Sequence, residues 1–132
     1  MKLNQLRLVV VLFSFACVGR TVIGNDPFAE IQDVRIGDER FCDADLSMLL
    51  EIPSLRVLDL SRTAISDDGI ALLLQKSKLA GLDFSRTQIS DRSLLTFDKL
   101  PELRELDIAS TNVTKGALEE FRRRNPRCLV FD

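Results

Sequence analysis

Apolar positions recur at a fixed interval along most of the chain. Segments starting at Leu55 and Leu79 show the pattern most clearly, because both place large apolar residues at the same distances from their first residue. The interval between these two starts defines 24-residue units, and the same step in either direction gives further units that start at Ile31 and Leu103. A fixed period of this length indicates a repeat array in which every unit supplies one supersecondary structure.

Six columns of the aligned units are apolar without exception, at offsets zero, three, five, ten, fifteen and eighteen from the first residue. Offsets three and five alternate, which predicts a short strand with those side chains pointing into the core. Offsets fifteen, eighteen and, more weakly, twenty-one advance in steps of three, as on one face of a helix. Each unit is therefore predicted to be a strand, a turn and a short return helix, stacked into a parallel sheet with right-handed crossovers.

The predicted helices have recognisable first residues. Ser66, Ser90 and Thr114 stand at the head of the helical pattern, where a hydroxyl can accept a hydrogen bond from a free backbone N–H. Cys42 has this place in the first unit, so the neighbouring Asp43 is the expected cap there.

Residues 127–132 are predicted to form a final cap strand without a helix. Pro126 lies one residue further from Pro101 than one full repeat, which predicts that this strand is shifted by one residue. The shift would set Cys128 against Leu103.

Residues 1–24 have the pattern of a secretory signal peptide: basic residues, an apolar run over Leu8–Val18, then small residues at Gly19 and Gly24. The run is short for a membrane span, which takes roughly 20 residues. Cleavage is predicted, and the alternatives are an uncleaved anchor or lipidation at Cys17. The chain would be secreted or periplasmic, within the cell envelope, with membrane attachment only in those two alternatives. Residues 25–30 are a polar lead-in, and residues 31–132 are the repeat domain.

Composition narrows the possible functions. The chain of 132 residues contains no His, which removes imidazole catalysis and imidazole metal ligands. A net charge of −2 argues against a nucleic-acid partner, which needs a basic face. Cys42 and Cys128 fall at opposite ends of the array and are expected to be separate, mostly buried thiols. No enzyme activity, cofactor or metal site is expected.

The motif L-x-x-L-x-L-x-x-T-x-I-x-D resembles the leucine-rich repeat family. It comprises Leu55, Leu58, Leu60, Thr63, Ile65 and Asp67, and it recurs from Leu79 and Leu103. The resemblance covers residues 31–132 and is closest to the ribonuclease-inhibitor-like and cysteine-containing types, as in short exported bacterial repeat proteins. It implies an α/β solenoid, a short horseshoe arc with parallel strands on the concave face and helices on the convex face. It also implies partner binding on the concave face.

Two departures from that family concern the residue at offset eight. The usual Asn or Cys is replaced by Thr63, Thr87 and Thr111, whose hydroxyls can still bond the turn backbone. Glu39 has this place in the first unit and is a poor substitute.

The candidate functional feature is a column of like charges. Offset four places Asp59, Asp83 and Asp107 on neighbouring strands about 4.8 Å apart, with Arg35 at the end of the row. Water could screen the column, Arg62 and Arg86 could balance it, a calcium ion could sit on it, or a basic partner could cover it. The candidate partner-binding residues are Arg35, Asp59, Asp83, Asp107, Arg62, Arg86 and Glu105. This face is expected to lack aromatic anchors.

The preferred hypothesis is a non-catalytic module that binds an unidentified protein partner. The alternative is a structural or vestigial repeat protein with no dedicated ligand. A run of basic residues, Arg122–Arg124, either complements the dipole of the last helix or forms a small patch for an anionic partner.

Overall fold

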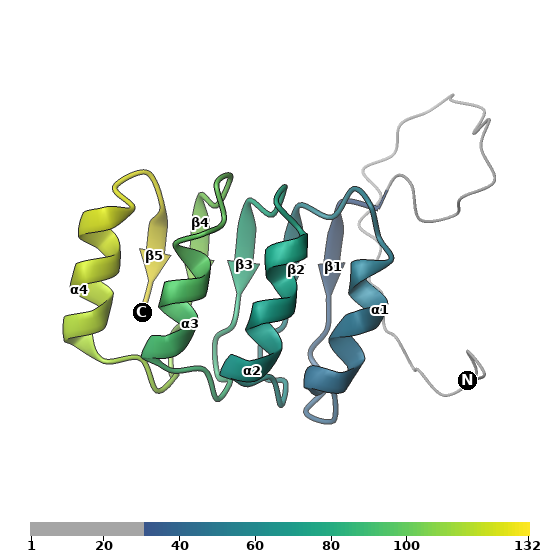
Figure 1. Cartoon of the computed structure of the whole chain (residues 1–132). Helices are drawn as coiled ribbons and strands as arrows, with labels where there is room; N and C mark the ends of the chain where they lie inside the picture. Colours follow the sequence, from purple (N-terminus) through teal and green to yellow (C-terminus); the bar gives the residue numbers. More distant parts are fainter. Residues whose placement is uncertain (1–30) are drawn as a thin grey trace.

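The computed structural model describes residues 31–132 as a row of parallel strands covered on one side by helices (Figure 1). The strands are β1 (Asp33–Arg35), β2 (Val57–Asp59), β3 (Gly81–Asp83), β4 (Glu105–Asp107) and β5 (Leu129–Phe131), and they lie side by side in chain order. This is the predicted leucine-rich repeat arc, with strands on one face and helices on the other. The predicted signal peptide, the lead-in and Cys17 lie outside the described residues.

The strand register keeps the phase of the repeat throughout. Val34 pairs with Leu58, Leu58 with Leu82, and Leu82 with Leu106, and each partner lies one full repeat further along the chain. The last step is the same, because Leu106 pairs with Val130.

The predicted one-residue shift of the cap strand, with Cys128 against Leu103, is therefore wrong. The segment from Pro101 to Pro126 is one residue longer than a repeat, but the link from Pro126 to β5 is one residue shorter than the link from Pro101 to β4. Pro126 precedes Leu129 by three residues, whereas Pro101 precedes Glu105 by four, so the register is kept. A slip of one residue turns every side chain of a strand to the opposite face. The observed register consequently directs Leu129 and Phe131 out of the concave face and Val130 toward the core.

The return segments differ in length along the array. They are η1 (Asp43–Asp45) with α1 (Leu46–Leu50), α2 (Asp67–Ile70) with the 3₁₀ segment η2 (Ala71–Gln75), α3 (Asp91–Phe97) and α4 (Lys115–Arg124). Only α4, with ten residues, exceeds two helical turns. These short helices depend on packing their apolar face against the sheet, because isolated helices of this length are marginal in water.

Two of the three predicted hydroxyl caps are present. The Ser66 hydroxyl accepts from the Asp68 N–H, and the Thr114 hydroxyl accepts from the Ala117 N–H. Ser90 also precedes its helix, but its hydroxyl makes no capping bond and instead donates to Asp67. Asp43, the expected cap of the first unit, does not cap its own helix.

The core contains the predicted apolar columns almost completely. Nearly all of these side chains are buried, and Ile31 and Val113, one at each end of the array, are only partly buried. The rings of Phe84 and Phe97 stack at 5.4 Å between centroids. Burying a side chain of this size contributes about 1.5–3 kcal/mol, so these columns account for most of the driving force for stacking.

The predicted threonine bonds are present in the turns after the strands. Thr63, Thr87 and Thr111 each donate to the carbonyl three residues earlier, at 2.6, 2.6 and 2.7 Å. The first unit closes its turn differently. Asp38 accepts from the backbone and the guanidinium of Arg40, and these bonds lower the pKa of Asp38 to about 2.

Cys42 and Cys128 are free thiols, as predicted, although both are half-buried rather than fully buried. Burial raises the pKa of the Cys128 thiol, partly offset by the nearby Arg104, so it is less reactive than an ordinary cysteine.

Candidate partner-binding face

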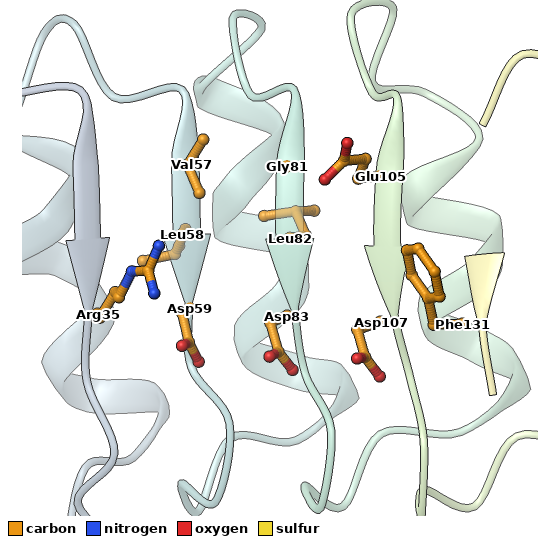
Figure 2. Close-up of a pocket in the computed structure, with 10 residues that line it drawn as sticks. All are labelled: Arg35, Val57, Leu58, Asp59, Gly81, Leu82, Asp83, Glu105, Asp107 and Phe131. Atoms are coloured by element: carbon orange, nitrogen blue, oxygen red, sulfur yellow. The ribbon is translucent and has the colours of Figure 1, made fainter. Parts of the chain in front are cut away.

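Three aspartates form a row across the concave face of the sheet (Figure 2). Asp59 pairs with Asp83, and Asp83 with Asp107, so the three carboxylates occupy the same position on β2, β3 and β4. Strand alternation and the constant register together bring them there, as predicted. We call Asp59, Asp83, Asp107 and the neighbouring Glu105 the acidic strip.

Each aspartate of the row also has a local structural role. One carboxylate oxygen accepts a hydrogen bond from the backbone N–H two residues further on, at 3.0 Å for Asp59, 2.8 Å for Asp83 and 3.0 Å for Asp107. This bond begins the turn that follows the strand and holds the carboxylate in one orientation. The side chains therefore present a fixed row of charge.

The acidic strip has no ion-pair partner among residues 31–132. All the salt bridges in this part of the chain involve other carboxylates. Arg35, at the β1 end of the row, pairs with Asp33 at 3.5 Å. Like charges on neighbouring strands repel each other, so the strip is a place where an added positive charge would be stabilising.

The predicted balancing arginines lie elsewhere. Arg62 and Arg86 occupy the turns after β2 and β3 with left-handed φ angles of 59° and 58°, and both are exposed. Their backbone N–H groups donate to the carbonyls of Ser85 and Ala109 in the next unit. Neither residue lines the concavity, so the structure does not bring them together with the aspartates.

The concave face does contain an aromatic residue, contrary to the expectation from sequence. Phe131 pairs with Asp107, and its side chain, which is 54% exposed, lies on the same face of the sheet as the acidic strip (Figure 2). Leu129 lies on the same face of β5 and is 63% exposed. The sequence does contain a signal for Phe131, which lies one full repeat after Asp107, but the predicted one-residue shift of the cap strand is incompatible with it.

These residues line a shallow concavity of about 220 Å³. Arg35 lies at one end, Phe131 at the other, and the acidic strip between them (Figure 2). Within residues 31–132 there is no group of three or more acidic or cysteine side chains suited to hold a metal ion. A hard cation such as calcium needs six to eight oxygen ligands, whereas the aspartate row supplies one carboxylate from each strand.

The arginine run of the last helix is already paired. Arg122 contacts Asp132 at 2.5 Å, Arg123 contacts Glu120 at 2.5 Å, and Arg124 contacts Asp98 at 2.9 Å. These contacts favour the structural interpretation of the run over a patch for an anionic partner. In the described part of the chain, no helix is both long and apolar enough to cross a membrane.

Comparison with known proteins agrees with this architecture. A leucine-rich repeat sequence profile matches residues 51–74. An internalin from Listeria monocytogenes has a similar fold, with a TM-score of 0.51 and 18% identity over 77% of this chain and 34% of that one. A leucine-rich repeat protein from Leptospira interrogans gives a TM-score of 0.47 and 17% identity over 64% of this chain and 27% of that one. No curated protein matches the chain.

The profile match over residues 51–74, the in-phase repeats and the parallel arc show that this chain contains leucine-rich repeats. It spans only 27–34% of the length of the two solved structures. The ribonuclease-inhibitor-like subtype stays a prediction.

Proposed function

We propose that this chain is a non-catalytic interaction module that binds a basic, extended segment of a protein partner across its concave face. The observation that carries the proposal is the acidic strip: its three aspartates are oriented by backbone N–H groups and have no ion pair of their own among residues 31–132. A segment that crosses β2, β3 and β4 could place lysine or arginine side chains against successive carboxylates.

The physics of such a contact predicts its behaviour in solution. Two opposite charges about 4 Å apart near a protein surface attract by about 4 kcal/mol before the cost of desolvation. Exposed charges are screened within about 8 Å at physiological salt, so the attraction weakens as salt increases. We therefore expect fast, salt-dependent association of moderate affinity.

The direct test is titration of a lysine- and arginine-rich peptide into the chain, followed by calorimetry. Asp83→Lys should abolish binding. Asp83→Asn should weaken binding, because it removes the negative charge. The asparagine keeps a side-chain oxygen that can accept from the Ser85 N–H. The two variants together therefore distinguish the effect of the charge from the effect of the turn. Asp68→Lys is the matched control, because Asp68 is an exposed acid on the helical side that pairs only with Arg92. Unchanged affinity in both Asp83 variants would contradict the proposal.

The alternative is a structural or vestigial repeat protein with no dedicated ligand. The shallowness of the concavity favours this alternative. Absence of binding by basic, acidic and neutral peptides alike would support it.

We also propose that the chain is exported to the cell envelope or beyond it. The support is the basic–apolar–small order of residues 1–24. Mass analysis of the N-terminus of the chain produced in cells would distinguish cleavage after Gly19 or Gly24 from lipidation at Cys17 and from an intact N-terminus.

A further inference from the structure

The middle strand of the sheet, β3, has no side chain at its first position on the concave face. Gly81 occupies this position and pairs with Val57 on β2 and with Glu105 on β4. In Figure 2 the Glu105 side chain extends toward β3, and Val57 stands on the opposite side of Gly81. These three residues form a gap in the row of side chains at the centre of the sheet, which we call the glycine notch.

The backbone does not require a glycine in the notch. Gly81 lies in a parallel ladder of constant register, without a bulge, and its φ angle is outside the left-handed region. An added Cβ would lie 3.5 Å from both methyl groups of Val57, which is ordinary van der Waals contact. Glycine weakens a strand interior, and it often marks a place where a ligand approaches the backbone closely. With no bulge or positive φ to explain Gly81, the close approach of a ligand is the interpretation that we develop.

The walls of the notch differ in chemistry. Val57, which is 37% exposed, supplies an apolar wall. Glu105 supplies a carboxylate on the other side, and the Asp83 carboxylate lies two residues further along β3 (Figure 2). Because β2 and β4 are separated by two strand spacings, about 9–10 Å, and carbon atoms in contact lie about 3.5–4.0 Å apart, there is room for one unbranched alkyl chain between the walls.

We propose that the glycine notch seats one lysine or arginine side chain of the partner, with its alkyl stem over Gly81 against Val57 and its charged head at Glu105 and Asp83. The notch is part of the concave face, so its role rests on the function proposed above. Charge complementarity argues for this occupant, because neither carboxylate has an ion pair among residues 31–132. The apolar wall argues for a long stem, because lysine and arginine lay their methylene groups along apolar surface while the charged head stays in water.

A notch of this kind distinguishes basic side chains by their length. The carboxylates alone attract any positive charge, whereas contact with Val57 requires methylene groups. A side chain of 2,4-diaminobutyrate has the same charge as lysine but two fewer methylene groups, so it loses that contact. A norleucine side chain keeps the apolar stem but leaves Glu105 and Asp83 without a counter-charge. The notch should therefore favour lysine over both analogues.

The experiment is calorimetric titration of three blocked peptides in which serine alternates with lysine, 2,4-diaminobutyrate or norleucine, at a pH at which both basic peptides are fully charged. The parent chain should bind the lysine peptide at least about tenfold more tightly than either analogue. Gly81→Val fills the notch and should weaken binding of the lysine peptide by about tenfold, to the level of the diaminobutyrate peptide. Gly81→Ala should give a smaller loss.

Two controls separate a filled notch from a damaged fold. Gly37→Val makes the same change at a glycine that does not line the concavity, where an added Cβ has only the Ser61 carbonyl within reach, at 4.0 Å. This variant should bind the lysine peptide as the parent chain does. Valine is also favoured over glycine in strands, so Gly81→Val should unfold in urea at a concentration no lower than the parent chain requires.

Each remaining outcome would contradict a different statement. Equal affinity of the parent chain and Gly81→Val for the lysine peptide, with binding still abolished by Asp83→Lys, would overturn the role of the notch and leave the proposed function intact. Equal affinity of the parent chain for the two basic peptides, or tighter binding of the norleucine peptide, would also overturn that role. No binding of either basic peptide by the parent chain would overturn the proposed function and the notch together.

Discussion

Asp67 accepts two hydrogen bonds from Ser90, one from its backbone N–H at 2.8 Å and one from its hydroxyl at 2.5 Å. Ser90 begins the helix of the following unit, so this pair joins two neighbouring repeats. Asp43 and Ser66 repeat the arrangement one unit earlier, at 2.9 and 2.5 Å. The strands join the units on the concave side, and these aspartate pairs join them at the start of the helices.

The row of pairs continues for one more step and then ends. Asp91 accepts from the N–H and hydroxyl of Thr114 at 2.7 and 2.9 Å. The next equivalent position is Lys115, whose side chain has no acceptor. At the other end, the Cys42 N–H donates to Asp45 of its own unit at 2.9 Å.

The first prediction concerns the strength of the Asp67–Ser90 pair. Asp67 also accepts from the Ser93 hydroxyl, so Asp67→Ala leaves three donors without their acceptor. Hydrogen bonds to charged groups contribute about 1.5–3 kcal/mol, and we expect the free energy of unfolding to fall by about 2–3 kcal/mol. Urea denaturation of the variant measures this change.

The neighbouring Asp68 supplies the control for that experiment. It is exposed and its side chain contacts only Arg92, at 3.3 Å, and surface ion pairs contribute between 0 and about 1 kcal/mol. Asp68→Ala should therefore be close to neutral. If the two alanine variants were equally stable, the contacts of Asp67 would not be a significant source of stability.

A second prediction concerns acid pH. Burial alone would raise the pKa of Asp67, but the hydrogen bonds from Ser90 and Ser93 and the nearby Arg92 hold it below its ordinary value of 3.8. A carboxylate with a lowered pKa in the folded state stabilises the protein above its unfolded pKa, and the stabilisation is lost as pH falls through the folded pKa. The stability difference between the parent chain and Asp67→Asn should be constant above about pH 5 and should shrink below about pH 4.

Denaturation midpoints measured from neutral pH into the acid range would test this. A difference that stays constant over the whole range would show that protonation of Asp67 does not contribute to acid unfolding.

A third prediction concerns glycine at the contact between the first two units. A Cβ added to Gly69 would overlap the Asp43 carboxylate and would lie 2.8 Å from Leu46 Cδ1. Gly69→Ala should therefore displace Asp43 from Ser66 and destabilise the protein by about 1–3 kcal/mol. Gly116→Ala is the control, since nothing lies within 4 Å of its added Cβ in α4, and it should stabilise by about 0.5–1 kcal/mol. Thermal unfolding should separate the two variants in opposite directions.

A fourth prediction concerns the buried turn threonines. Thr87 is 5% exposed and donates to the Phe84 carbonyl at 2.6 Å. Thr87→Val keeps the shape but removes the donor, so we expect a loss of about 1–2 kcal/mol. Thr87→Ser keeps the donor and should lose less. The hydrogen bond would be shown to be unimportant if the valine variant were as stable as the parent chain in urea denaturation.

The candidate site was partly predictable from sequence. The aspartate row follows from strand alternation and a constant register, and both follow from the apolar columns. The proline spacing does not place Phe131 correctly, because the chain adjusts the length of the link before β5. The directions of Arg62 and Arg86 depend on their left-handed backbone conformation. This conformation is rare for residues other than glycine, so the sequence does not predict it at an arginine.

The sequence by itself determined the repeat length, the order of strand and helix, and the residues of the core. Each apolar column is buried only when the units stack in phase, so the hydrophobic effect specifies the stacking from the pattern alone. Tertiary structure alone decided which polar groups of neighbouring units meet. Asp67 and Ser90 belong to different repeats, and their contact exists only after the two helix starts have been brought together by the core. Polar contacts across units depend on ångström-scale geometry, which an apolar period does not encode.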